Sequence, residues 1–234
     1  IKFLLFGGKG GVGKTTISCA TALRLSDLYP KKRILLFSTD PARSLSYCLN
    51  TAIKNDGSYI TDNLFVHEMD AEKEYQKLKH LYSEEIKNIL PISNENAFVD
   101  IAFDTEIMDS FIDMLPPGID EVMALTSIID FIDNNKFDIF ILDTAPTGHL
   151  IRFLEMPELA IAWLKFFFNI FLKYRDIYRM PRLSAFMVDL SKKIKKLLAL
   201  LRDSNKTLFT PISILTEMSY EETIDLINAV KCLK

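Results

Sequence analysis

Short apolar runs, separated by turn and helix-capping residues, mark the chain from its start. Residues 1–6, 33–38 and 137–142 are rich in Phe, Leu and Ile, and each run has the length of a strand buried on both faces of a sheet. Between the first two runs, residues 14–28 have helical periodicity that stops just before Pro30. This strand–helix–strand order predicts an α/β fold with a doubly wound, mostly parallel sheet.

The helix expected over residues 14–28 should bury one apolar face against that sheet. Its spacing predicts a face made of Ile17, Ala20, Ala22, Leu23 and Leu25. Residues 64–69 and 207–214 are weaker strand candidates, the second because Pro211 would remove a hydrogen-bond donor from a central strand.

Capping residues place further helices in the rest of the chain. Asp70 is a candidate N-cap for a helix over residues 71–90, and Pro117 is a candidate first residue of a helix that reaches Asn134. Ser219-x-x-Glu222 has the spacing of a capping box before a last helix.

These patterns predict a single domain over residues 1–234, with a helical insertion subdomain. The inserted helical material is expected at about residues 71–116 and 157–205. The sequence begins without a methionine and stops soon after its last predicted helix begins, so we expect a truncated piece of a longer protein.

Composition narrows the class of protein. The chain has 234 residues, of which 49% are hydrophobic, and this is enough for a substantial core. Its net charge of −3 gives no overall attraction to nucleic acid, so no nucleic-acid partner is expected. The most apolar stretch, residues 159–172, contains Lys165 and falls short of the roughly 20 apolar residues that span a bilayer. Isolated cysteines and the lack of a signal peptide favour a cytoplasmic protein that is not itself transmembrane.

A glycine-rich segment follows the first predicted strand and opens the first predicted helix. It satisfies the phosphate-loop pattern G-x-x-x-x-G-K-S/T in the strand-to-helix context that the pattern requires. In a chain of average composition and this length, the pattern should occur by chance about once in a hundred sequences. The residues of the loop are Gly8, Lys9, Gly10, Gly11, Val12, Gly13, Lys14 and Thr15.

Each residue type in this loop has a chemical task. Glycines let backbone N–H groups turn inward around phosphate oxygens, because a Cβ atom would clash or forbid positive φ angles. Lys14 is placed to reach the β and γ phosphates, and the Thr15 hydroxyl is suited to bind Mg²⁺. The amino terminus of the following helix adds about half a positive charge that faces the anion.

Two carboxylates are expected beside the loop. Asp40 follows the strand at residues 33–38, and Asp143 follows the strand at residues 137–142, so both should lie at the carboxyl edge of the sheet, where ligands bind. One such acid can hold a magnesium-bound water and another can orient the attacking water. Taken alone, either acid could instead be a helix cap or turn residue, as Asp40 before Pro41 illustrates.

Several segments resemble one known family of P-loop NTPases. Lys9, within GKGGVGKTT, resembles the signature lysine of the deviant Walker A (SIMIBI-class) ATPases, which reaches across a dimer to the partner's nucleotide. Residues 38–45 (STDPARSL) and 143–149 (DTAPTGH) resemble the two switch segments of the branch that contains ArsA, the arsenite-pump ATPase, and the ATPase that targets tail-anchored membrane proteins. Residues 117–121 (PGIDE) resemble a further segment of that family.

The resemblance implies a Mg²⁺-dependent ATPase that closes around ATP as a homodimer or fused tandem. It assigns positioning of the attacking water to Asp40, a place in the magnesium shell through water to Asp143, and support of the phosphates to Thr16. Lys9 would act on the partner's nucleotide. The implied partner is a membrane-protein client or a membrane pump subunit, which would bring this cytoplasmic chain to a membrane surface.

The sequence departs from the family at informative positions. Arg43 stands where His is common in this branch, and these residues contain no C-x-x-C zinc pair. No cysteine lies between Cys48 and Cys232, which disfavours the spaced-cysteine mode of arsenite binding. Delivery of a hydrophobic helix and efflux of an anion such as arsenite both remain open. The alternative from another class is a nucleotide-gated switch that positions itself on a membrane or on DNA.

Two helical stretches bear on the client. Residues 159–174 (LAIAWLKFFFNIFLKY) are apolar nearly all round, which is typical either of a buried helix or of a groove for another protein's hydrophobic helix. Residues 191–202 place four lysines opposite a leucine face, which indicates either a solvated helix face or a contact with a membrane or an acidic partner.

Overall fold

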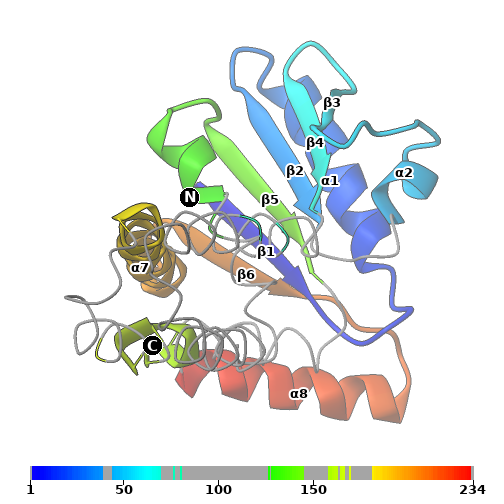
Figure 1. The fold of residues 1–234 in the computed structure, drawn as a ribbon. Helices are drawn as coiled ribbons and strands as arrows, with labels where there is room; N and C mark the ends of the chain where they lie inside the picture. The colour runs from blue at the N-terminus through cyan, green and yellow to red at the C-terminus, as the bar shows by residue number, and fades with distance from the viewer. Residues whose placement is uncertain are drawn as a thin grey trace, which may run out of the picture.

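The computed structural model of the protein describes residues 2–38, 44–69, 76, 80, 126, 128–144, 158–162, 164–166, 169 and 181–232. Within these residues, six strands form one sheet in the order β3-β4-β2-β5-β1-β6 (Figure 1). The strands are β1 (Phe3–Gly7), β2 (Ile34–Ser38), β3 (Ser58–Tyr59), β4 (Leu64–Glu68), β5 (Ile139–Asp143) and β6 (Thr207–Pro211). Only the short β3 runs antiparallel to its neighbour, so the predicted mostly parallel sheet is confirmed.

Helices cover both faces of this sheet. They are α1 (Lys14–Leu28), α2 (Ser44–Cys48), α7 (Pro181–Arg202) and α8 (Glu217–Cys232), and residues 128–133 are helical as well. Side chains of α1 and α2 pack on one face, and side chains of α7, α8 and the helical residues 128–133 pack on the other. The fold is therefore the predicted doubly wound α/β fold.

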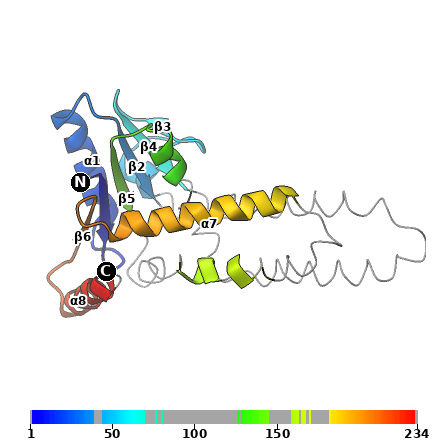
Figure 2. The ribbon, with the colours of Figure 1, turned by 90° about the vertical axis from the view of Figure 1, so that its left-hand side faces the viewer.

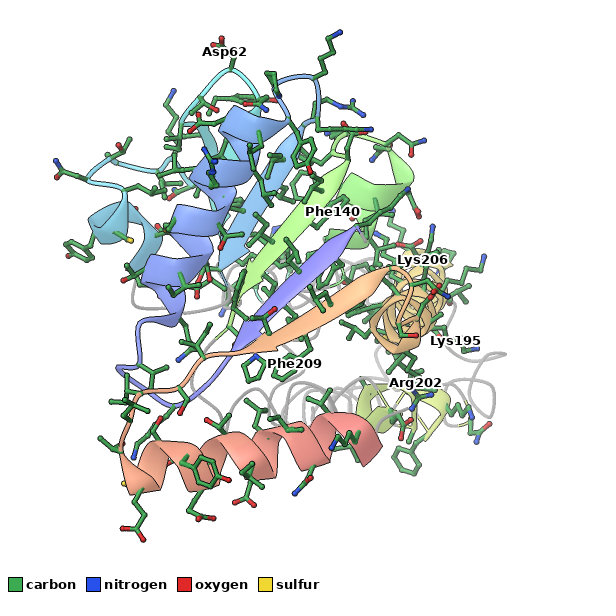
Figure 3. The ribbon with its side chains drawn as sticks, turned by 180° about the vertical axis from the view of Figure 1, so that it is seen from behind. Asp62, Phe140, Lys195, Arg202, Lys206 and Phe209 are labelled. Atoms are coloured by element: carbon green, nitrogen blue, oxygen red, sulfur yellow. The ribbon has the colours of Figure 1, made fainter. Side chains whose placement is uncertain are left out.

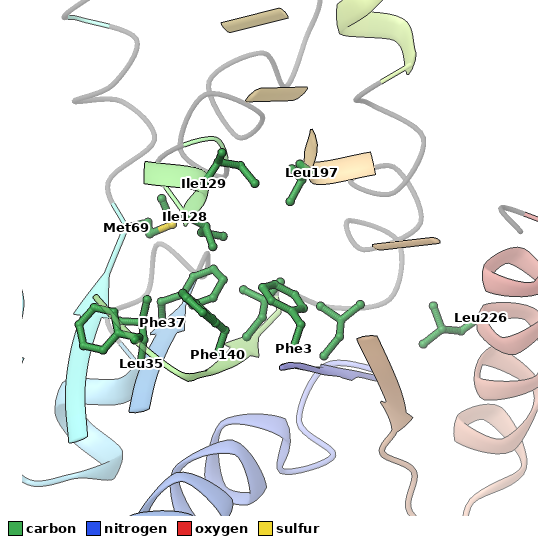
Figure 4. Close-up of a cluster of buried hydrophobic side chains, with 12 residues drawn as sticks. Phe3, Leu35, Phe37, Met69, Ile128, Ile129, Phe140, Leu197 and Leu226 are labelled. Carbon is green, nitrogen blue, oxygen red and sulfur yellow. The ribbon is translucent and has the colours of Figure 1, made fainter. Parts of the chain in front are cut away.

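The alternation of side chains along the strands builds two cores. Phe3, Leu35, Phe37 and Phe140 point to one face, where the rings of Phe3 and Phe140 stack at 6.3 Å between centroids (Figure 4). This face also receives Leu197 from α7 and Leu226 from α8, which are fully buried. The opposite face is filled by Phe6, Ile34, Leu36, Leu64, Val66 and Ile141, together with Cys19, Ala22 and Leu45 from the helices.

Helix α1 has the predicted bounds but only part of the predicted buried face. Ile17 and Leu23 are about two fifths exposed, at 41% and 37%, whereas small and polar side chains are buried. The buried side chains of α1 are those of Lys14, Ser18, Cys19, Ala22 and Ser26. The prediction is confirmed for Ala22 and for Leu25, which packs against the core, but it is wrong for Ile17, Ala20 and Leu23. This helix is positioned by polar contacts as well as by apolar packing. Ser18 bonds to the end of β5, and Ser26 lies 2.7 Å from the Thr61 hydroxyl.

Strand β6 is an edge strand of the described sheet, and this explains how it accommodates a proline. Pro211 is its last residue and lies beside Gly7 of β1. After it, the Ile212 amide donates a 2.7 Å hydrogen bond to the Gly7 carbonyl, so the chain stays attached to the end of β1. The loss of one donor at Pro211 therefore leaves the pairing of the strand intact.

Helix α7 is the long helix that runs out beyond the sheet in Figure 2. Its buried side chains, Met187, Leu190, Ile194 and Leu197, recur at helical spacing. On its basic face, Lys193 pairs with Asp130 at 2.7 Å and Lys196 pairs with Asp133. Lys192 is exposed, and so is Lys195, which Figure 3 labels. Half of the predicted lysine cluster is thus neutralised by acids of the neighbouring helical residues 128–133.

Other sequence predictions fall partly or wholly outside the described residues. The helix predicted over residues 71–90 is represented only by Gln76 and His80, both helical, and residues 117–125 are not described. The insertion boundaries at 71–116 and 157–205 therefore stay predictions. In the part of the chain that is described, none of the helices is long and apolar enough to cross a membrane.

Candidate functional site

The glycine-rich segment forms a turn between the end of β1 and the start of α1. Gly11 and Gly13 have φ angles of +79° and +92°, the left-handed region that other residues enter at a cost. Space around both is open, because a Cβ atom built on either glycine would meet no other atom within 4 Å. The loop thus has positive φ angles of the kind that a phosphate-binding turn requires.

The amino terminus of α1 has the features of an anion site at this turn. Gly13 is the N-cap residue, and no side chain caps the helix there. The first turn carries no acidic residue, and the Ile17 amide is the first to bond back, to the Gly13 carbonyl at 3.0 Å. The amides of residues 14–16 are thus the donors that the start of a helix offers to a cap or an anion.

Lys14 is buried at the base of the loop, with 7% of its surface exposed. Its ammonium donates a 3.0 Å hydrogen bond to the Lys9 carbonyl, so the side chain folds back over the turn. A buried ammonium needs hydrogen-bonding or charged partners, and this position keeps the charge beside the space that the glycines leave open.

Asp143 ends β5 and is fully buried beneath the loop. The Thr15 hydroxyl donates to its Oδ2 atom at 2.8 Å, and the Ser38 hydroxyl donates to the same atom at 3.4 Å. The Ser18 hydroxyl donates to Oδ1 at 3.1 Å. The structure therefore brings together Thr15 and Asp143, the two residues that the sequence predicted around a metal ion, and adds two serines that the sequence analysis did not single out.

The sequence alone does not reveal the two serines, because their contacts depend on how β2 and α1 are placed beside β5. Ser38 is the last residue of β2 and pairs with Asp143 across the sheet. Ser18 lies one helical turn after Lys14, and its single hydroxyl proton is shared between Asp143 and the Lys14 carbonyl, which lies at 2.8 Å. Both hydroxyls thus fix the carboxylate from neighbouring elements, β2 and α1.

A second carboxylate lies at the same edge of the sheet. Glu68 ends β4 and accepts hydrogen bonds from the Ser46 amide at 3.0 Å and the Ser46 hydroxyl at 2.8 Å, which holds the start of α2. Helix α2 directly follows residues 39–43, the middle of the first switch-like segment. The sequence predicted neither α2 nor this contact, since a five-residue helix is too short to show periodicity.

Cysteine chemistry near the site is shaped by burial. Burial raises the pKa of the Cys19 thiol well above its ordinary value, and a hydrogen bond with Cys48 and the charges of Cys48, Asp143 and Glu68 raise it further. The exposed Cys48 thiol lies 3.9 Å from the Thr15 carbonyl. The Cys19 thiol is therefore neutral and unreactive in the folded protein.

The remaining predicted site residues lie in different surroundings. Lys9 forms an ion pair with Glu222 of α8 at 3.3 Å. Thr16 and Gly10 are exposed at the surface of the loop, and Val12 is buried. Asp40, with the rest of residues 39–43, lies outside the described residues, as do residues 145–149 of the second switch-like segment.

The residues present fit a magnesium ion bound together with a nucleotide. Among the described residues, no three acidic, histidine or cysteine side chains converge on one metal position. Magnesium in nucleotide sites needs no such cage, since it keeps several waters and uses one or two protein oxygens with the phosphates. The Thr15 hydroxyl and the Asp143 carboxylate, 2.8 Å apart, supply that kind of donor set.

A parallel doubly wound sheet, a glycine loop that opens an uncapped helix, and a buried lysine at its base define a P-loop nucleoside triphosphatase. The whole chain, residues 1–234, matches the family model described as anion-transporting ATPase. This chain belongs to that family and is an ATPase, as the resemblance of its motifs predicted.

Named relatives agree with the family. The chain is 32% identical to "ATPase asna-1" of Caenorhabditis elegans over 97% of this chain and 70% of that protein. It is 36% identical to "ATPase ASNA1 homolog" of Plasmodium falciparum over 73% of this chain and 40% of that protein. It is 38% identical to "ATPase get3" of Schizosaccharomyces pombe over 67% of this chain and 44% of that protein. The match thus spans 40–70% of these relatives.

Proposed function

We propose that this ATPase requires Mg²⁺ and acts as a dimer that opens and closes with the state of its nucleotide. Binding and hydrolysis of ATP would drive delivery of a client at a membrane, with the chain working in the cytoplasm or at the membrane surface. The observation that carries the nucleotide chemistry is the 2.8 Å hydrogen bond between Thr15 and the buried Asp143, directly below the glycine loop.

Each site residue has a role in this proposal. Backbone amides of the loop and the Lys14 ammonium hold the phosphates, with Thr16 as a further support. The Thr15 hydroxyl would hold Mg²⁺ and Asp143 would hold it through water, while Ser18 and Ser38 hold the carboxylate in place. The metal neutralises charge on the phosphates.

Two residues complete the reaction. Asp40 orients the attacking water, a role that rests on its place after β2 and on the family resemblance. Lys9 reaches the nucleotide of a second copy of the chain, so that hydrolysis needs both subunits. Positioning of this kind is the main contribution of a protein to phosphoryl transfer.

The described residues favour a hydrophobic client over a small anion. Two large apolar side chains in residues 158–169 are exposed, Leu159 at 61% and Phe166 at 58%, whereas Ala160 and Leu164 of the same segment are buried. Binding of arsenite by spaced cysteines would need them in the helical insertion, whereas Cys19 and Cys48 lie on α1 and α2. A segment that both packs on the fold and presents apolar side chains is suited to hold an apolar helix of another protein.

The dimer and the assigned roles are tested with three variants and a mixing experiment. Lys14→Ala should lose ATP turnover, and Asp40→Asn should bind nucleotide but not hydrolyse it. Lys9→Ala should be inactive alone, yet mixed with Asp40→Asn it should recover part of the activity, because each mixed dimer has one intact arrangement. Wild-type turnover by Asp40→Asn would remove that residue from its role.

The class of client is tested by peptide binding and by the effect of arsenite on turnover. A peptide with the sequence of a single membrane-spanning helix should bind and protect residues near Phe166 from hydrogen exchange, and arsenite should leave turnover unchanged. Co-sedimentation with vesicles or DNA that depends on ATP and needs no client would favour the positioning switch instead.

A further inference from the structure

Lys9, the lysine expected to act across a dimer, is paired within its own chain. Its ammonium lies 3.3 Å from the Oε1 atom of Glu222, and the two side chains are 25% and 35% exposed. The backbone of Lys9 is held as well, since its carbonyl accepts the hydrogen bond from the Lys14 ammonium. The side chain and the backbone carbonyl of Lys9 thus both have partners inside one subunit.

Glu222 is available for this contact because it does not cap its helix. The capping box predicted from Ser219-x-x-Glu222 is wrong, since α8 begins at Glu217. The N-terminal cap is Thr216, whose hydroxyl accepts a 3.3 Å hydrogen bond from the Ser219 amide. The Ser219 hydroxyl bonds instead to the segment before the helix, 3.0 Å from the Ser213 hydroxyl. Glu222 therefore lies in the second turn and extends toward the loop.

The segment that carries Glu222 is fixed relative to the glycine loop. The Ile212 amide donates to the Gly7 carbonyl at 2.7 Å, and β6 pairs with β1 along its whole length. A Cβ atom on Gly8 would collide with the Ile212 carbonyl, so these two backbones are in close contact. The backbone that leads into α8 is thereby held beside the loop that carries Lys9.

We propose that Glu222 is a positioning residue that retains Lys9 in its own subunit and competes with the nucleotide of the second subunit for the same ammonium. The inference rests on the proposed action of Lys9 across the dimer. A triphosphate with its magnesium carries more negative charge than one carboxylate, so ATP in the partner can displace Glu222. Release of Lys9 then becomes a step in closing the dimer, and Glu222 sets how readily that step occurs.

The expected effect is moderate because the pair is partly exposed. Ion pairs of this kind shift an equilibrium only by about two- to fivefold. A closed dimer releases two such pairs, so Glu222→Gln should lower the protein concentration at half-maximal ATP turnover by about four- to twenty-fivefold, without lowering maximal turnover. Glu222→Asp keeps the charge and should remain near the wild-type concentration.

The test measures turnover against protein concentration for the full-length wild type, Glu222→Gln, Glu222→Asp and Glu221→Gln. Glu221 is the exposed neighbour on the same helix and controls for loss of one negative charge. Sedimentation velocity with a non-hydrolysable ATP analogue measures dimer formation independently of hydrolysis and should shift in the same direction. Equal melting temperatures of the variants without nucleotide would exclude a general effect on folding.

Failures of the inference and of the proposed function are distinguishable with Lys9→Ala. If Lys9→Ala turns over ATP like the wild type, the proposed action of Lys9 across the dimer is wrong. If Lys9→Ala is impaired while Glu222→Gln keeps the wild-type concentration dependence, only the role of Glu222 is wrong. A lower maximal turnover in Glu222→Gln would likewise contradict it, because Glu222 would then assist Lys9 instead of retaining it.

Discussion

The Thr15 hydroxyl and the Asp143 carboxylate meet at 2.8 Å, although 128 positions separate them in the sequence. Thr15 is the second residue of α1 and Asp143 ends β5; β1 leads into α1 and pairs with β5. Asp143 is fully buried, and burial of a carboxylate costs free energy that hydroxyl donors offset only in part. The proposed magnesium site would give this costly contact a function beyond stability.

Asp143→Asn separates the effect of this contact on ATP turnover from its effect on stability. The amide keeps the shape of the side chain but removes the charge that holds the metal, so ATP turnover should fall by roughly a hundredfold or more. Stability without nucleotide should stay equal or rise, since a buried charge is removed. Thermal unfolding with and without Mg²⁺ and ATP measures both effects. A variant that retained the wild-type stabilisation by Mg²⁺ and ATP would contradict the assignment of Asp143.

Gly8→Ala should disturb the loop through Ile212, the residue directly after β6. The added methyl group would collide with the Ile212 carbonyl, which belongs to backbone and cannot turn away. Overpacking of this kind costs about 1–3 kcal/mol, and urea unfolding without nucleotide measures it. Gly11→Asn is the matched control, because its surroundings are open and asparagine tolerates a positive φ angle. An equal loss of stability in the two variants would show that the Ile212 contact is not the cause.

The sequence predicted the parts of the fold that depend on local pattern. The glycine loop, Pro30 and the apolar periodicity predicted a helix over residues 14–28, and α1 has these bounds. The strands followed from short apolar runs, to within about two residues at most ends. Strand β3 and helix α2 were missed because two and five residues are too few to show a period.

Contacts between elements far apart in the chain could not be predicted from the local sequence pattern. Ser38 meets Asp143 only because β2 and β5 pair in one particular register. Ser18 does so because α1 turns a polar side chain, not an apolar one, toward the sheet. Glu222 has the correct spacing for a capping box, yet an earlier residue caps the helix and leaves it to pair with Lys9.

Cys19 and Cys48 should differ sharply in reactivity. In a Cys232→Ser background at pH 8, iodoacetamide should modify the exposed Cys48 and leave the buried Cys19 intact until the protein unfolds. Mass spectrometry of the digested protein distinguishes the two sites. Modification of Cys19 at the rate of Cys48 would show that α1 and α2 separate readily in solution.

The raised pKa of Cys19 also predicts how stability depends on pH. Burial keeps this thiol protonated in the folded protein, whereas the unfolded chain releases the proton above about pH 8.5. The contribution of the protonated Cys19 thiol to the free energy of unfolding is therefore complete below that pH. It is lost as the pH rises, by at most about 1.4 kcal/mol per pH unit. Urea unfolding at pH 7.5 and pH 10 should show a larger loss in the wild type than in Cys19→Ala. Equal losses would contradict a titrating thiol at this position.

Thr216→Ala tests the start of α8. Its hydroxyl accepts the hydrogen bond from the Ser219 amide, and loss of such a cap costs about 1 kcal/mol. Thr216→Ser keeps the hydroxyl and should be close to the wild type in urea unfolding. Glu222→Gln should change stability by less than about 0.5 kcal/mol, because its partly exposed ion pair contributes little. The opposite order, with a large loss in Glu222→Gln and none in Thr216→Ala, would mean that Glu222 caps the helix after all and is not free to retain Lys9.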